Sequence, residues 1–389
     1  MVWWVPWALG GILLVGSQFI ENKGDSKKEL DELLNEKGYV KFQDKKNGVF
    51  GVELNNGSSF KDLENLKGSI ENTLKSEVEV SNDNFNYFIR KKERKVIPSN
   101  IPFKLIDTSS EKGFRIAIGV GGDGIIYLDF AKVPHTLIGG ATGWGKSIFT
   151  KNIIIQIINN FPSSEFDLLD FKSGIELGDF KDLRQVKSFT IIPDEAEVVL
   201  SRIYTEIEDR FAIITGTNSR DWVAFNTKSK EKINPRFVII EEFTILLDQS
   251  KEVSKVLTKC LAIGRAVGVF FIFTSQRFDA KIIDPRIKAN IDNRICFHTA
   301  DSTNSKVILD TTGAETIKTV GRCLFSQNGE VIECQAFNIK ENDVINAIQS
   351  HLKAHREEVD KKKTTNSYKN KKAAEGLKSG NNEGVILWE

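Results

Sequence analysis

Cysteine and histidine are scarce in this chain of 389 residues, which contains four of each. The cysteines form no CxxC pair, and three of them lie in apolar or strand-like runs, so we expect buried, reduced thiols and no disulfide framework. The few histidines offer no evident Ser-His-Asp arrangement. His351 and His355 are four residues apart, but no third ligand lies near them in the sequence, so a metal site there is not expected.

An excess of either charge is also missing, since Lys and Arg total 54, Asp and Glu total 53, and the net charge is +1. This balance neither supports nor excludes a nucleic-acid partner, because a protein can confine positive charge to a channel while its average stays neutral. The hydrophobic content of 40% fits a globular protein. The length allows one large domain and a smaller one.

Charged residues are absent from residues 3–20, a run rich in Trp, Leu, Ile and Val. At about 1.5 Å per residue a helix of this length would just cross a bilayer core of about 30 Å. No basic segment precedes the run and no A-x-A-like site follows it, which argues against a cleaved signal peptide. We therefore expect a single-pass anchor at residues 1–20. A buried core helix is the alternative, because the run is short. The lysines at positions 23, 27 and 28 place the remainder in the cytoplasm.

The rest of the chain changes character several times. Residues 21–37 are charged with leucines at helical spacing, which predicts a linker helix, and residues 38–130 mix strand and helix patterns as a small α/β domain. In residues 131–345, apolar runs alternate with helical stretches, which predicts a largely parallel sheet flanked by helices. Residues 346–389 are lysine-rich and poor in apolar residues, as in a flexible tail. The strands expected in the larger domain are residues 135–138, 166–170, 237–240, 269–274 and 294–298.

The strongest motif matches the phosphate-binding pattern G-x-x-x-x-G-K-[ST] in full and lies between an expected strand and an expected helix. Its glycines allow successive backbone N–H groups to point at phosphate oxygens, and the helix N-terminus adds partial positive charge. Lys146 is expected to neutralise the β- and γ-phosphates, and Ser147 to bind Mg²⁺. The motif therefore predicts nucleoside triphosphate binding. Its residues are Gly140, Ala141, Thr142, Gly143, Trp144, Gly145, Lys146 and Ser147.

Acidic and polar residues follow two further expected strands. Glu241 and Glu242 end one apolar run, and we assign Glu241 to the Mg²⁺ shell and Glu242 to the general base that activates water. Gln276 ends another run, where it could sense the γ-phosphate or orient water; a turn or capping role is the alternative. Arg265 could act as an arginine finger across a subunit interface, or form a surface salt bridge.

The order of several motifs resembles the FtsK/SpoIIIE family of DNA translocases over about residues 38–345. The resemblance implies a RecA-like P-loop ATPase motor that assembles as a homo-hexamer, uses ATP and Mg²⁺, and pulls DNA, expected to be double-stranded, through its channel. It also suggests channel contacts at Lys281, Arg286 and Lys288. The motifs are Pro134-His135-Thr136-Leu137 before the phosphate loop, Asp170-Phe171-Lys172, Glu208-Asp209-Arg210-Phe211, residues 238–243, Gly264-Arg265-Ala266, Thr274-Ser275-Gln276-Arg277, residues 287–291, Arg294-Ile295, Asp301-Ser302, residues 308–310, Gly313-Ala314-Glu315 and Gly321-Arg322.

The chain also departs from that family's pattern. Glu241 stands where the family normally has Asp, and Phe171 replaces the Pro of Asp-Pro-Lys. A single short anchor and the lack of a DNA-reading domain in residues 346–389 look more like the plasmid and conjugative-element members, which suggests relaxosome or mating-pore partners. A chromosome-segregation or phage-packaging motor of the same fold is one alternative. An ATP-binding membrane scaffold with weak hydrolysis is the other, because Glu241 is unusual.

Overall fold

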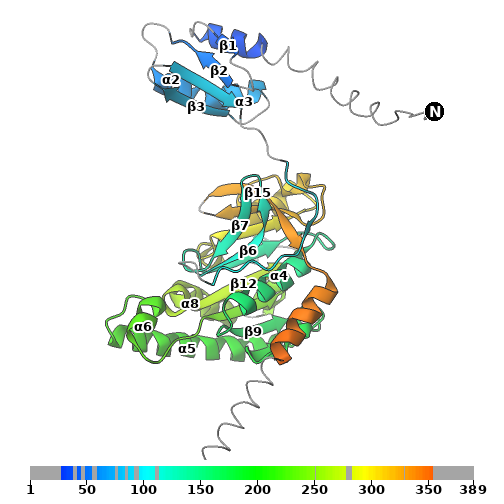
Figure 1. Cartoon of the computed structure of the whole chain (residues 1–389). Coiled ribbons are helices and arrows are strands. Elements are labelled where there is room, and N and C mark those ends of the chain that lie inside the picture. Colours follow the sequence, from blue (N-terminus) through cyan, green and yellow to red (C-terminus); the bar gives the residue numbers. More distant parts are fainter. Residues whose placement is uncertain are drawn as a thin grey trace, which may run out of the picture. The chain divides into compact units, whose positions relative to one another are not determined.

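The computed structural model describes residues 28–37, 42–44, 49–54, 59–74, 78–83, 86–91, 96–109, 114–249, 251–276, 283–327 and 329–353. The chain divides into two compact units, Met1–Val96 and Ile97–Glu389 (Figure 1). Among the described residues, no helix combines the length and apolar character that crossing a membrane requires. The anchor expected at residues 1–20 lies outside these residues, as do Lys281, His355 and most of the expected tail.

The first unit contains a four-stranded antiparallel sheet in the order β1-β2-β4-β3. Helix α2 begins after Ser59, whose hydroxyl accepts the N–H of Asp62 while the Asp62 carboxylate accepts the N–H of Ser59. The helix of residues 28–36, expected as a linker, belongs to this unit because Leu30 and Leu34 are buried in its core. The bounds are β1 Phe42–Asp44, β2 Val49–Val52, α2 Phe60–Asn65, α3 Lys67–Leu74, β3 Val78–Asp83 and β4 Asn86–Lys91.

The second unit is built on an 11-stranded sheet in the order β10-β9-β11-β12-β8-β13-β14-β15-β6-β7, with β5 paired to β15. The strands from β10 to β13 in this order run parallel, and those from β13 to β7 pair antiparallel. The bounds are β5 Ile101–Pro102, β6 Arg115–Gly121, β7 Gly124–Asp129, β8 Thr136–Gly139, β9 Glu165–Asp170, β10 Val186–Thr190, β11 Arg236–Glu241, β12 Val269–Ser275, β13 Asn293–Phe297, β14 Arg322–Gln327 and β15 Glu330–Asn338.

The strands expected from apolar runs are confirmed as β8, β9, β11, β12 and β13. Every residue of β11 and β12 is buried, as is typical of central parallel strands covered on both faces. The division between the units comes after Val96 and not, as predicted, at residue 130. The reason is that β6 pairs with β15 and β7 with β6, so both strands extend the large sheet.

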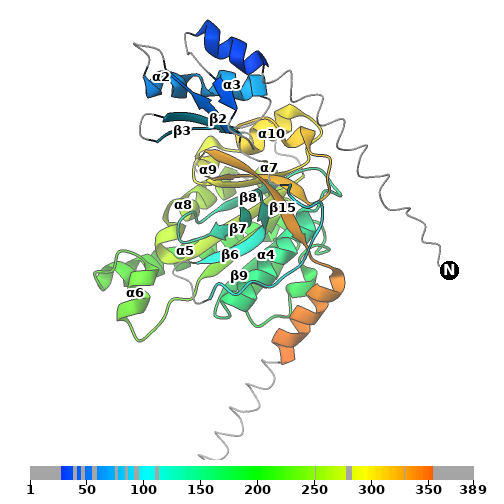
Figure 2. The same ribbon diagram turned by 45° about the horizontal axis from the view of Figure 1, so that its top comes forward.

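Helices cover both sides of the parallel strands, with α4 on one side and α5 and α8 on the other (Figure 2). Helix α4 packs against β6 and β15, and α8 packs against β12 and α5. Residues 341–353 form a further helix, so the predicted tail begins too early. The buried Ile348 and the partly buried Leu352 attach that helix to the core. The bounds are α4 Lys146–Asn160, α5 Ala196–Gly216, α6 Trp222–Lys228, α7 Phe243–Gln249, α8 Lys251–Val267, α9 Pro285–Lys288 and α10 Ser302–Leu309.

The four cysteines are buried and free, which confirms the expectation of buried thiols. Burial raises the pKa of the Cys260 thiol to about 12, so this group stays protonated at neutral pH.

The buried imidazole of His135 joins the start of β8 to two neighbouring elements. Its Nε2 donates to the carbonyl oxygen of Leu261 in α8 at 3.0 Å, and its Nδ1 accepts the N–H of Phe271 in β12 at 3.1 Å. Both bonds together require the neutral ring with its proton on Nε2. Burial lowers the pKa of His135 from 6.5 to about 4, although the bond to Leu261 opposes this effect.

We predict that this histidine makes the folded protein sensitive to acid. In the unfolded chain His135 binds a proton below pH 6.5, whereas the folded protein excludes it until about pH 4, so stability falls as the pH drops through this window. Between pH 7 and pH 5 the free energy of unfolding should fall by roughly 2 kcal/mol more in the wild type than in His135→Gln, as measured by urea unfolding. Equal losses in the two proteins would contradict this role for His135.

Candidate functional site

The glycine-rich loop connects the end of β8 at Gly139 to the start of α4 at Lys146. Gly140 has φ of 138°, and a Cβ there would lie 2.7 Å from the Cβ of Phe297, so a side chain cannot be accommodated. Gly143 and Gly145 have φ of 83° and 106°, in the region that L-residues disfavour. These glycines therefore allow the loop to curl over the N-terminus of α4, where backbone N–H groups attract an anion.

Neighbouring segments hold the loop in place. The N–H of Ala141 donates to the carbonyl oxygen of His298 at 2.8 Å, and the rings of Trp144 and His298 stack with their centroids 4.0 Å apart. The carbonyl oxygen of Trp144 accepts the N–H of Gly321 at 3.1 Å. The loop is thus fastened to the segments after β13 and before β14.

Lys146 is a buried cation at the end of this loop, with 5% of its surface exposed. Burial lowers its pKa, and the nearby charge of Lys172 lowers it further. Within the described part of the chain, no acidic oxygen forms an ion pair with its ammonium group. A buried ammonium without a close counter-ion is costly, so phosphate oxygens on the adjoining N–H groups would complete this site.

Glu241 and Glu242 lie at the carboxyl end of β11, as the sequence predicts. Glu241 is 1% exposed, and its carboxylate accepts the hydroxyl of Thr274 from the adjacent strand β12. Glu242 has φ of 58°, a left-handed conformation that is unusual for a residue other than glycine. Successive strand residues point to opposite faces of a sheet. The altered backbone at Glu242 lets both carboxylates reach the same cation.

That cation is Lys172, in the segment after β9. Its ammonium nitrogen lies 3.4 Å from Oε1 of Glu241 and 3.2 Å from Oε2 of Glu242. Burial alone would lower the pKa of Lys172, but the two carboxylates outweigh that effect and raise it. From the sequence, Lys172 is recognisable only as part of the Asp170-Phe171-Lys172 motif and is not among the predicted site residues. No local pattern connects it to residues about seventy positions away.

The two carboxylates have different protonation properties. Burial raises the pKa of Glu241, although the Thr274 hydroxyl and Lys172 oppose it. Burial acts in the same direction on Glu242, but there the Ser275 hydroxyl, the Gln276 N–H and Lys172 outweigh it and lower the pKa. Glu242 is therefore ionised at neutral pH, as a general base for water requires.

Gln276 links this acidic pair to the phosphate loop. Its side-chain oxygen accepts the hydroxyl of Thr142 at 2.7 Å, and its N–H donates to Oε1 of Glu242 at 3.2 Å. Ser275 donates to the same carboxylate oxygen at 2.8 Å. The structure thus brings together Thr142, Gln276 and Glu242, which fits a γ-phosphate sensor or a water-orienting group better than an isolated turn residue.

The donor set around the loop fits Mg²⁺, which prefers oxygen ligands. Ser147 lies in the first turn of α4, and Glu241 supplies carboxylate oxygens at the end of β11. Within the part of the chain that the structure describes, no group of three or more His, Cys, Asp or Glu side chains forms a separate metal site. Magnesium here would therefore depend on the bound triphosphate for further ligands.

Three other residues named from the sequence lie apart from this centre. Arg265 is at the end of α8, just before β12 begins, and so at the opposite end of that strand from Gln276; its Nε donates to the carbonyl oxygen of Ala131 at 3.2 Å. Arg286 is paired with Asp284 at 2.6 Å and Lys288 with Asp310 at 2.5 Å. The roles suggested for Arg265, Arg286 and Lys288 stay predictions.

Two family-like motifs have structural roles. Asp170 is buried, and its carboxylate accepts the N–H groups of Lys172, Glu176 and Leu177 at 3.0, 2.9 and 2.8 Å, which shapes the segment that carries Lys172. Arg210 donates to the carbonyl oxygens of Asn234 and Val267 at 2.8 and 3.2 Å, and so ties α5 to the segments that lead into β11 and β12.

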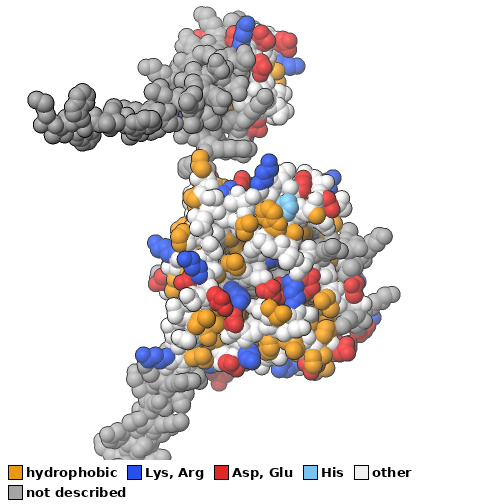
Figure 3. All heavy atoms as spheres, turned by 90° about the vertical axis from the view of Figure 1, so that its right-hand side faces the viewer, with side chains coloured by type: hydrophobic (Ala, Val, Ile, Leu, Met, Phe, Trp, Pro, Cys, Tyr) orange, Lys and Arg blue, Asp and Glu red, His pale blue; other side chains and the backbone are white. Residues whose placement is uncertain are grey.

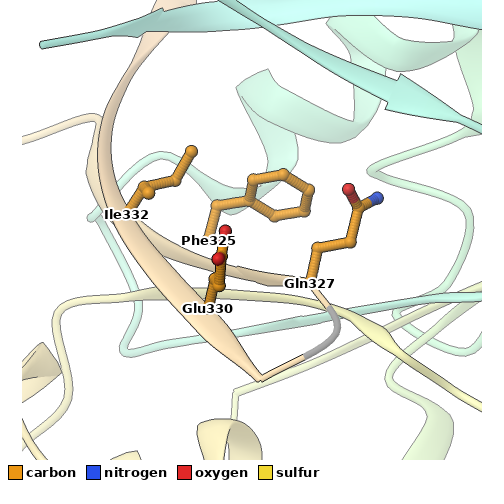
Figure 4. A pocket seen from close by; sticks show the side chains of 4 residues that line it. All are labelled: Phe325, Gln327, Glu330 and Ile332. Carbon is orange, nitrogen blue, oxygen red and sulfur yellow. The ribbon is translucent and has the colours of Figure 1, made fainter. Parts of the chain in front are cut away.

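A hollow of about 290 Å³ at the β14–β15 hairpin is lined by Phe325, Gln327, Glu330 and Ile332 (Figure 4). Gln327 donates to the side-chain oxygen of Asn293 at 2.7 Å, and Asn293 begins β13. The hollow therefore lies at the amino ends of the parallel strands, away from the phosphate loop, and is not part of the nucleotide site.

A phosphate loop lies between the parallel strand β8 and helix α4, and a carboxylate pair lies at the end of β11, which β12 separates from β8. This arrangement places the second unit among the P-loop ATPases. The model of the FtsK/SpoIIIE family matches residues 107–325, and the chain belongs to this family.

The chain is similar to curated proteins named DNA translocase FtsK. It is 31% identical over 278 residues to the protein of Caldanaerobacter subterraneus subsp. tengcongensis, covering 68% of this chain and 39% of that protein. It is 32% identical over 263 residues to that of Borreliella burgdorferi, covering 63% of this chain and 33% of that protein. The chain therefore spans well under half of the length of these relatives.

Two solved structures share the fold. The pCW3 conjugation coupling protein TcpA, in its monomer form with ATPγS, has a TM-score of 0.63 at 22% identity, with 85% of this chain and 99% of that chain covered. The second and third ATPases of EssC from Geobacillus thermodenitrificans have a TM-score of 0.60 at 16% identity, with 67% and 53% covered.

We predict that Lys172 sets the pH dependence of hydrolysis through Glu242. Because Lys172 helps to lower the pKa of Glu242, Lys172→Met should raise that pKa, and the acidic limb of the kcat profile should move to higher pH. The measurement is ATP hydrolysis between pH 5 and pH 9. Lys151→Met is the matched control, since Lys151 also has 21% side-chain exposure and pairs with Asp179 at 2.7 Å. Equal profiles for the two variants would refute this role.

Proposed function

We propose that this chain is a membrane-anchored, ATP-driven DNA translocase that moves plasmid or conjugative-element DNA. The observation that carries the proposal is the link from the phosphate loop through Thr142 and Gln276 to the ionised Glu242, in a chain of the FtsK/SpoIIIE family. DNA as the cargo is supported by the names of the curated relatives. Transfer between cells is supported by the name of the coupling protein that shares the fold.

The site residues account for hydrolysis as follows. Lys146 and the N–H groups of the loop hold the phosphates, and Glu242 takes a proton from the attacking water. Ser275 and the N–H of Gln276 fix one oxygen of Glu242 and so orient the other. Magnesium held by Ser147 and Glu241 would neutralise phosphate charge.

The proposed contacts with DNA involve a few separate basic residues. On the face of the second unit in Figure 3, lysines and arginines are interspersed with acidic residues, so this face lacks the one-sided positive charge that favours phosphate binding. A DNA phosphate at Arg286 or Lys288 would compete with Asp284 or Asp310.

Membrane attachment and assembly are further parts of the proposal. Residues 1–20 would anchor the chain once in the cell membrane, with the motor in the cytoplasm; loss of the chain from the membrane fraction after their deletion tests this.

A homo-hexamer would place Arg265 against a neighbouring nucleotide, and its mass in solution can be measured by light scattering. Relaxosome or mating-pore proteins are the partners that this function would require.

The experiment measures ATP hydrolysis by the chain lacking residues 1–20, alone, with duplex DNA and with single-stranded DNA. Duplex DNA should stimulate hydrolysis, and Lys146→Ala should abolish the stimulated rate. Glu242→Gln should lower the rate by about 10² to 10⁴ and leave ATP binding intact, because only the proton acceptor is lost.

The other outcomes separate the alternatives. Preference for single strands would favour coupling to transfer of a nicked strand over movement of duplex DNA. If ATP binds but neither DNA raises the rate above that of Lys146→Ala, the motor proposal fails and the scaffold alternative takes its place.

A further inference from the structure

His298 contacts the phosphate loop both through its backbone and through its ring. It directly follows β13, which pairs in parallel with β8, so it lies beside the point where the loop leaves the sheet. Its carbonyl oxygen accepts the N–H of Ala141 at 2.8 Å, near the start of the loop. Its ring stacks on that of Trp144, near the end of the loop, with centroids 4.0 Å apart and planes inclined by 29°. One residue outside the loop thus contacts it at two points.

A third contact sets the orientation of the imidazole. Its Nδ1 lies 2.9 Å from the carbonyl oxygen of Ile317, in the segment between β13 and β14. A carbonyl oxygen can only accept, so Nδ1 must carry a proton and donate this bond. The bond therefore restrains the ring of His298 in the orientation that faces Trp144.

The loop needs external support because most of its side chains are small. Of the six residues from Gly140 to Gly145, three are glycines, and Trp144 has the one large side chain. A Cβ at Gly143 would meet nothing within 4 Å, so this turn is open and not packed. Glycine loses more conformational freedom on ordering than any other residue. A contact that orders the loop before the triphosphate arrives lowers the entropic cost of binding it.

Thr142 and Trp144 connect the loop to different parts of the site. Thr142 donates to Gln276, whose N–H donates to Glu242, the proposed proton acceptor. The stack at Trp144 leads away from that carboxylate, to the segment between β13 and β14. Trp144 lies two positions before Lys146, so the stack holds the backbone that leads into this lysine. The stack can therefore act on the binding of triphosphate without acting on proton transfer.

We propose that His298 is a positioning residue for ATP binding. Its ring holds Trp144, and through it the backbone before Lys146, in the conformation that receives the phosphates. His298 acts only through the loop, and we assign it no part in the activation of water. The inference rests on the proposed binding of ATP at the loop. Loss of the ring should therefore raise the KM for ATP and leave kcat nearly unchanged.

The experiment measures ATP binding by calorimetry, and ATP hydrolysis, for the full chain and its variants. His298→Ala should weaken binding and raise KM by about fivefold or more, with kcat within about twofold of the wild type. His298→Phe keeps a ring that can stack and should restore both constants to within about twofold. His298→Asn keeps a donor close to the place of Nδ1 but has no ring, and should behave as His298→Ala does.

The matched control is His351→Ala. His351 is partly buried, as His298 is, but lies on the helix of residues 341–353. In the described part of the chain, no hydrogen bond or ring contact joins it to the loop. This substitution should change neither binding nor hydrolysis.

A second variant removes the other half of the stack. Trp144→Ala should weaken ATP binding about as much as His298→Ala, and the double variant should bind no more weakly than either single one, because the same contact is lost. Hydrogen exchange of the nucleotide-free chain reports the order of the loop directly. The amides of Ala141 and Gly321, which donate to His298 and Trp144, should exchange at least about threefold faster in His298→Ala than in the wild type.

Several results would overturn the proposal. They are a His298→Phe variant that binds ATP no better than His298→Ala, a fall in kcat in place of a rise in KM, additive losses in the double variant, and unchanged exchange of the two amides. If Lys146→Ala weakens ATP binding and His298→Ala does not, this inference alone fails. If Lys146→Ala has no effect on binding, the proposed binding of ATP at the loop fails.

Discussion

Parallel pairing of β8 with β12 on one side and β13 on the other is the constraint on which the site depends. Because these strands and β11 run in the same direction, their carboxyl ends lie along one edge of the sheet. The phosphate loop leaves β8 at that edge, Glu241 and Glu242 leave β11, and Gln276 follows β12. The order of the strands alone is therefore enough to bring the phosphate loop close to Gln276, although the two are more than a hundred positions apart in the sequence. The buried apolar runs of β11 and β12 maintain that order, since neither strand has a polar face to present to water.

The charges at this edge balance one another within a buried environment. Lys146 and Lys172 are the cations of this group, and the carboxylates of Glu241, Glu242 and Glu176 raise the pKa of both against the effect of burial. Lys172 contacts both carboxylates directly, whereas among the described residues no ion pair joins Lys146 to an acidic side chain. This arrangement explains why two adjacent glutamates of opposite pKa shift coexist: Glu241 is more deeply buried, and Glu242 has more hydrogen-bond donors. Replacing Glu241 with aspartate would keep the negative charge and shorten the side chain by one methylene group.

Patterns of neighbouring residues predicted the phosphate loop and most of the parallel strands, because these features depend on consecutive residues. The phosphate loop, its flanking strand and helix, and the acidic end of β11 each consist of consecutive residues, and β8, β9, β11, β12 and β13 coincide with largely apolar runs. The remaining parallel strand, β10, is Val-Lys-Ser-Phe-Thr and has no such run. The position of Lys172 between the glutamates was not predictable, because it depends on how β9 lies next to β11. The boundary at Val96 was missed for a related reason: β6 and β7 look like strands of any small α/β domain until β15 is known to pair with β6. Arg265 was predicted to act at a nucleotide from its spacing in the sequence. Spacing did not reveal that it lies at the end of β12 opposite to Gln276.

The left-handed backbone of Glu242 has a consequence for how this site can change. A non-glycine residue in that conformation costs on the order of 1 kcal/mol or more, and here the cost is tolerated because the carboxylate is held by Ser275, Gln276 and Lys172. Glycine or asparagine would occupy the same backbone with less strain. Selection of random variants for heat resistance alone should therefore enrich glycine or asparagine at position 242, at the expense of the proton acceptor. With Glu242 as the proposed proton acceptor, such an exchange would gain stability and lose hydrolysis, so backbone strain and the proposed activity are coupled at this one position.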